Sequence, residues 1–93
     1  MSTDMKPGGN MENSLEDTFN QLRYRIETDL GGTIRYYNAQ NRLHREEGPA
    51  VIYTDGTKKW FHNGTLHRED GPAVIEPDGT QFWYINGKFI KHE

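Results

Sequence analysis

Two polar clusters contain the residue types that acid–base or metal chemistry requires. They are His44-Arg45-Glu46-Glu47 and His67-Arg68-Glu69-Asp70, in a chain of 93 residues. An imidazole beside carboxylates could bind a metal ion, and in stacked copies His44 would lie near His67. The same residues could instead form a local ion pair that holds a bend, with the imidazole packed on an aromatic neighbour. We favour the structural interpretation, because an active site is a single constellation and this one is duplicated.

The offset between His44 and His67 recurs well beyond the two clusters. Asp55-Gly56 returns as Asp78-Gly79 at the same offset, and Trp60 returns as Trp83. Such a fixed period is typical of proteins that stack copies of one small unit. The chain has no cysteine, and its serines lie outside the repeated part. We therefore expect no enzyme, no catalytic residue, no metal site and no cofactor.

Composition limits the size of the core and the type of partner. Hydrophobic residues make up 32% of the chain and the mean hydropathy is −0.99, yet aromatic residues reach 12%. A thin core built from cross-strand aromatic pairs fits these values. The net charge of −3 comes from residues 1–32, since residues 33–93 hold eight basic and eight acidic side chains. We therefore do not expect nucleic acid as a partner, and with no apolar run or secretory signal we expect a cytoplasmic protein without a membrane segment.

Local sequence signals divide the chain into three parts. Residues 1–13 are polar and predict a flexible tail. Residues 14–22 have apolar side chains at helical spacing and predict a short helix. Residues 23–93 predict a mainly β domain, an antiparallel β-hairpin repeat meander forming one twisted sheet. Its hairpin turns are Asp-Gly pairs on one side and Asn63-Gly64 and Asn86-Gly87 on the other.

Adjacent aromatic residues recur in each copy of the unit. Neighbours along a strand face opposite sides of a sheet, so one member of each pair can join the core while the other reaches solvent unless something covers it. These pairs could stack nucleic-acid bases beside Arg35, Lys58 and Lys59. The neutral repeat region favours ordinary cross-strand packing instead. The pairs are Tyr36-Tyr37, Trp60-Phe61 and Trp83-Tyr84.

The run from Trp60 to Glu69, with its aromatic pair, Asn-Gly, Leu and acidic residue, resembles the MORN-variant repeat. The segment from Trp83 to Phe89 matches the first half of that pattern, and Tyr36-Tyr37 is a poorer copy without Asn-Gly. The resemblance covers roughly residues 33–93. It implies stacked hairpins and a binding role in small bacterial or phage proteins, and it implies no catalytic residue.

These observations predict a non-enzymatic protein-binding module that acts by occlusion. The first expectation is a phage-encoded inhibitor of a host defence system, of the anti-CRISPR kind, whose partner is a host enzyme or effector complex. The alternatives are an immunity protein that neutralises a toxin, and a self-associating structural or assembly subunit. We expect a homodimer in any of these cases. Large aromatic and arginine side chains dominate protein interfaces, so the predicted contact residues are Tyr36, Tyr37, Arg45, Trp60, Phe61, Arg68, Trp83 and Tyr84.

Overall fold

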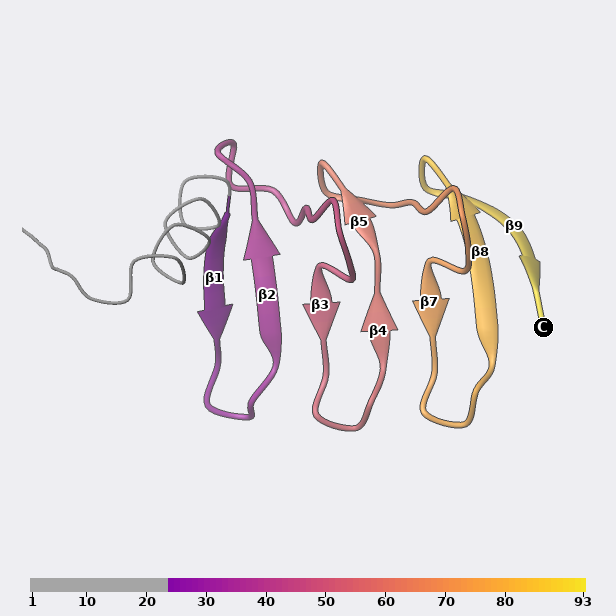
Figure 1. Ribbon diagram of the computed structural model, residues 1–93, viewed down its shortest axis with the longest axis horizontal. Coiled ribbons are helices and arrows are strands. Elements are labelled where there is room, and N and C mark those ends of the chain that lie inside the picture. Colours follow the sequence, from indigo (N-terminus) through magenta and orange to yellow (C-terminus); the bar gives the residue numbers. More distant parts are fainter. Residues whose placement is uncertain (1–23) are drawn as a thin grey trace, which may run out of the picture.

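The computed structural model describes residues 24–93, which form nine β-strands and no helix. Seven strands make one antiparallel sheet in the order β1-β2-β3-β4-β7-β8-β9, and β5 and β6 form a separate two-stranded sheet (Figure 1). The strands are β1 (Arg25–Thr28), β2 (Ile34–Tyr37), β3 (Val51–Ile52), β4 (Lys58–Lys59), β5 (Phe61–His62), β6 (Thr65–Leu66), β7 (Val74–Ile75), β8 (Gln81–Ile85) and β9 (Lys88–His92).

Three hairpin turns lie along the lower edge of the sheet in Figure 1, and each is closed by an aspartate. The Oδ1 atom of Asp55 accepts the N–H of Thr57 at 2.9 Å, and Asp78 accepts the N–H of Thr80 at the same distance. Asp29 accepts the N–H groups of Gly31 and Thr33 in the first turn. These bonds fix the turn because the side chain replaces a backbone acceptor. Glycines with positive φ complete all three turns.

Two-residue turns connect β5 to β6 and β8 to β9. Asn63 and Gly64 have φ values of 50° and 84°, and Asn86 and Gly87 have 50° and 80°. Both residues of such a turn need positive φ, which Asn and Gly tolerate best. At Gly87 a Cβ atom would also lie 2.8 Å from the Cγ2 atom of Thr65. The turn therefore packs directly on the preceding copy of the unit.

The buried core is small and follows the repeat. Ala50, Val51, Ala73 and Val74 are each at most 6% exposed, and they enter the sheet directly after a Gly-Pro bend. Tyr24 is 5% exposed and corresponds to Ala50 in the first copy of the unit. Each of the two lies two residues before an isoleucine of the following strand, Ile26 or Ile52. The hairpins are joined by short pairings, such as Ile34 with Ile52 and Lys58 with Ile75. The resulting structure is elongated, with extents of 49 × 24 × 22 Å.

The prediction of a mainly β, antiparallel hairpin structure is confirmed. The prediction of one sheet is wrong in one respect, because the chain changes its pairing partner at Trp60: β4 pairs with β7, whereas β5 pairs with β6 and forms its own sheet. The backbone N–H of Trp60 donates to Ala73 on one side, and its carbonyl accepts the N–H of His67 on the other. The predicted tail over 1–13 and helix over 14–22 lie outside the described residues.

Candidate functional site

The two polar clusters form loops that enclose one groove. The first loop, residues 43–49, lies between β2 and β3, and the second, residues 67–72, lies between β6 and β7. Between them lies a half-open hollow of about 430 Å³, with β5 contributing to its lining. We call this hollow the inter-loop groove. Its lining residues are Arg45, Glu46, Glu47, Trp60, Phe61, His62, His67, Arg68, Glu69 and Asp70.

A cation covers one aromatic ring in each copy of the unit. The guanidinium of Arg45 lies 4.0 Å from the ring centre of Tyr36, and that of Arg68 lies 4.1 Å from the ring centre of Trp60. The ammonium of Lys91 lies 4.5 Å from Trp83. These three cations occupy equivalent positions in successive copies, at the offset that separates His44 from His67. A cation over an aromatic face is attractive, so the ring is held against the loop of its own copy.

The glycine of each Gly-Pro bend makes room for the stacked arginine. Arg45 donates from Nη1 to the carbonyl of Pro49 at 3.2 Å, and Arg68 donates to Pro72 at 3.1 Å. A Cβ atom on Gly71 would lie 2.8 Å from the Cζ atom of Arg68. The bend and the stacked cation therefore depend on each other, and both guanidinium groups are used inside the protein.

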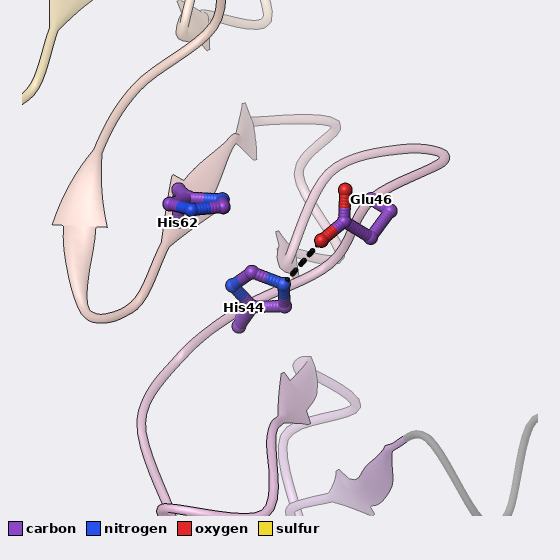
Figure 2. Close-up of side chains that lie close together, drawn as sticks. All are labelled: His44, Glu46 and His62. Carbon is purple, nitrogen blue, oxygen red and sulfur yellow. Dashed lines mark hydrogen bonds and ion pairs between the residues drawn. The ribbon is translucent and has the colours of Figure 1, made fainter.

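The two repeated histidines link each copy to the next. The N–H of Asn63 donates to Nδ1 of His44 at 3.0 Å, and the N–H of Asn86 donates to Nδ1 of His67 at 2.9 Å. An accepting Nδ1 places the proton of the neutral ring on Nε2. In His44 that nitrogen donates to Oε2 of Glu46 at 2.9 Å, as Figure 2 shows. Each histidine thus fastens its loop to the following Asn-Gly turn.

One set of donor atoms has the composition of a metal site. A nitrogen of His44, a carboxylate oxygen of Glu46 and a nitrogen of His62 lie within 4.8 Å of one another (Figure 2). A neutral histidine that binds metal through Nε2 carries its proton on Nδ1. That proton would meet the N–H of Asn63, so metal binding by His44 requires this bond to break. The arrangement therefore serves a hydrogen-bonded link better than a metal centre.

The sequence predicts that His44 and His67 lie close together, but a third imidazole lies between them. His62, on β5, lies between them, with ring centres 4.6 Å from His44 and 5.8 Å from His67. Position 62 corresponds to Ile85 in the following copy, so this histidine does not belong to the repeated pattern. The sequence contains no periodic signal that could have identified His62.

The two loops differ in how they use their last acidic residue. In the second loop, Asp70 accepts from Nε of Arg68 at 3.2 Å, which is the local ion pair that the sequence predicted. In the first loop, Glu47 instead accepts from the hydroxyl of Tyr24 at 2.6 Å. The same hydroxyl accepts the N–H of Glu46. Nε of Arg45 is therefore buried without a hydrogen-bond partner among the described residues. The first loop is held by hydrogen bonds to Tyr24, and the second by the ion pair of Arg68 with Asp70.

The predicted contact residues separate into two groups. Arg45, Trp60, Phe61 and Arg68 line the inter-loop groove. Tyr36, Tyr37, Trp83 and Tyr84 do not line it, and each is in contact with a cation or another ring. Arg25 lies 4.2 Å from the ring centre of Tyr37, and Phe89 packs on Tyr84 with ring centres 5.6 Å apart. All six aromatic residues are half-buried. The sequence did not identify Tyr24, Asn63, Asn86 or Lys91 as contributors to these contacts.

Comparison with protein-family models, with curated proteins and with solved structures gave no match. No helix of the length and apolarity needed to cross a membrane occurs in the part of the chain that the structure describes.

Proposed function

We propose that this chain is a non-enzymatic protein-binding module whose contact site is the inter-loop groove. The observation that supports this most directly is the hollow of about 430 Å³ between two loops of repeated sequence. Trp60 and Phe61 line the groove, and aromatic side chains are enriched in protein interfaces. Arg45 and Arg68 hold its two walls through their internal contacts. A partner segment seated there would be covered on two sides, so the module would act by occluding a surface of its partner.

The hydrogen bonds around the groove support a binding role over a catalytic one. Both loop histidines accept a backbone N–H through Nδ1, and both arginines donate to backbone carbonyls. A general base must be able to take a proton from a substrate, and a nucleophile must be able to reach the substrate. Side chains engaged in internal contacts give a preorganised surface instead, which lowers the cost of binding.

The contacts between hairpins support stacked repeat units of the MORN-variant type. The N–H of Gly64 donates to the carbonyl of Leu43, and the N–H of Gly87 donates to that of Leu66, the equivalent pair one copy later. In this proposal the rigid stack presents the groove to a partner in the cytoplasm. A phage-encoded inhibitor of a host defence complex is the role that the resemblance favours, and a toxin-neutralising immunity protein uses the same mode of binding.

Site-specific photo-crosslinking tests whether a partner occupies the groove. A benzoylphenylalanine replaces His62, which is exposed beside the groove floor, and in a matched variant it replaces Lys58, exposed on β4. Both proteins are irradiated in a lysate of the cells in which the chain is naturally made. We expect one discrete protein adduct at position 62 that excess wild-type protein suppresses and that position 58 lacks. The same adduct pattern at both positions would contradict a groove-specific contact.

A second candidate function is a self-associating structural subunit, and the C-terminal end of the sheet favours it. Ile85, Phe89 and Ile90 are 36%, 51% and 54% exposed. They occupy the places that His62, Leu66 and His67 hold in the preceding copy, so Ile85 and Ile90 put exposed apolar side chains where that copy has histidines. Sedimentation velocity of the wild type and of a Phe89→Ser/Ile90→Ser variant separates the candidates. A dimer that becomes a monomer in this variant supports self-association, and a wild-type monomer rejects it.

A further inference from the structure

The inter-loop groove has an acidic surface because its arginines are directed inward. The guanidinium groups of Arg45 and Arg68 lie on aromatic rings and donate to carbonyls of the bends. The carboxylates are more exposed, although Glu46 accepts a hydrogen bond from His44 and Asp70 accepts one from Nε of Arg68. The side chains of Glu46, Glu69 and Asp70 are 54%, 82% and 89% exposed. A ligand that enters the groove therefore meets carboxylates first.

The carboxylates stand on both walls of the groove. Glu46 and Glu47 belong to the first loop, and Glu69 and Asp70 belong to the second. The four carboxylates and two arginines that line the groove leave an excess of two negative charges among these six side chains. A ligand that spans the groove can contact acids on both sides, so two positive charges on one segment would be matched.

The floor of the groove suits a long basic side chain. Phe61 and the imidazoles of His62 and His67 provide flat, partly apolar surfaces between the walls. Lysine and arginine place an aliphatic stem on such surfaces while the charged head reaches polar groups. An arginine head would also form the strong charge-assisted hydrogen bonds that carboxylates accept. A phosphate backbone would meet repulsion from the same walls.

We propose that the inter-loop groove binds a basic segment of a partner protein, with Lys or Arg side chains that contact Glu46 on one wall and Glu69 on the other. This inference rests on the proposed protein-binding function and specifies the chemistry of the partner. The segment lies between the loops, over His62. Its cationic heads reach the exposed carboxylates, and Arg45 and Arg68 stay in their internal contacts.

Fluorescence anisotropy with a fluorescein-labelled hexa-arginine peptide tests the proposal on the full chain. A hexaglutamate peptide with the same label is the negative probe. The groove variant Glu46→Gln/Glu69→Gln removes one charge from each wall and keeps the side-chain length. The control variant Glu27→Gln/Glu93→Gln removes two charges from acids that are also exposed but that lie on β1 and just after β9, where they pair with Arg25 and Lys91.

We expect hexa-arginine to bind and hexaglutamate not to bind at low salt. The groove variant should weaken binding about tenfold, since each exposed pair contributes up to about 1 kcal/mol, and the control should stay within about twofold. Equal losses in the two variants would show a general charge effect and overturn the proposal. Displacement of the peptide by equimolar spermine would also overturn it, because the groove would then select small polycations.

If hexa-arginine does not bind, the proposal that the groove binds a basic segment of a partner is rejected. Failure of this inference is distinguishable from failure of the proposed function. If the position-62 crosslinker still gives its specific adduct, and hexa-arginine neither binds nor competes, the groove binds a protein of another chemistry. If neither the adduct nor the peptide complex forms, the groove is not a binding site.

Discussion

Lys91 lies over the ring of Trp83, 4.5 Å from its centre, in the place that Arg68 holds over Trp60. The last strand of the chain therefore repeats the contact that holds each earlier loop to its hairpin. Arg68 also donates to the carbonyl of Pro72, whereas Lys91 pairs with Glu93 at 2.8 Å. The cation thus stays over the ring although its second partner is a carboxylate and not a backbone carbonyl.

The first prediction concerns this terminal contact. Lys91→Ala should destabilise the docking of β9 by about 0.5–1 kcal/mol, the usual size of an exposed cation–π contact. Lys88→Ala removes an equal charge from the same exposed strand and is the control. Hydrogen exchange of the amide of Lys91 and its neighbours measures the change. Equal acceleration in both variants would mean that the ring contact contributes nothing beyond charge.

The second prediction concerns the Gly-Pro bend. Gly71→Ala should displace the guanidinium of Arg68, because the new Cβ atom would lie 2.8 Å from Cζ. Overpacking of this kind costs about 1–3 kcal/mol. Gly48→Ala is the matched variant, since its nearest arginine atom is 3.3 Å away and a smaller shift suffices. Urea unfolding measures both, and the prediction fails if Gly48→Ala is the more destabilised protein.

The positions of the turns and strands followed from the sequence because they depend on local chemistry. Asp55-Gly56 and Asn63-Gly64 require backbone geometries that few other residues adopt, so their neighbours form hairpins. The segment between the turns at Asp78-Gly79 and Asn86-Gly87, for example, contains β8. The change of partner strand at Trp60 could not be foreseen, because it depends on backbone bonds to Ala73 and His67 later in the chain.

The residues of the groove could be predicted only in part, for a related reason. Arg45 and Arg68 were identified because they repeat, but their direction depends on which ring lies beneath them. His62 has no repeated counterpart, and its place between His44 and His67 comes from the packing of successive copies. Tyr24 lies far before Glu46 in the chain, and no local pattern relates the two.

The third prediction is a loss of stability in acid that originates in the hairpin turns. The pKa of Asp55 is lowered by the hydrogen bond from the N–H of Thr57, then by the Thr57 side chain. The pKa of Asp78 is lowered in the same way by Thr80. A carboxyl whose pKa is depressed in the folded state stabilises the protein above its unfolded pKa of about 4. This contribution disappears as the pH falls through the lower, folded pKa.

Asp29 should contribute to the same acid transition. A side-chain hydrogen bond from Arg35 is the largest cause of its lowered pKa, followed by the N–H of Thr33. The free energy of unfolding should therefore fall below about pH 4. The variant Asp55→Asn keeps an acceptor oxygen for the turn but cannot titrate, so its stability should depend less steeply on pH in that range. Identical pH profiles for wild type and variant would contradict the assignment.

The fourth prediction concerns the link between His44 and the next hairpin. His44→Ala leaves the N–H of Asn63 without its acceptor in a part-buried place, and such a loss costs about 1–3 kcal/mol. His44→Asn offers an oxygen near the position of Nδ1, whereas His44→Gln places its amide nearer to Nε2 and Glu46. We expect urea unfolding to rank Asn above Gln and Ala in stability. If Gln is the most stable of the three, the bond to Glu46 contributes more than the link to Asn63, and the copies are joined mainly by their backbone pairing.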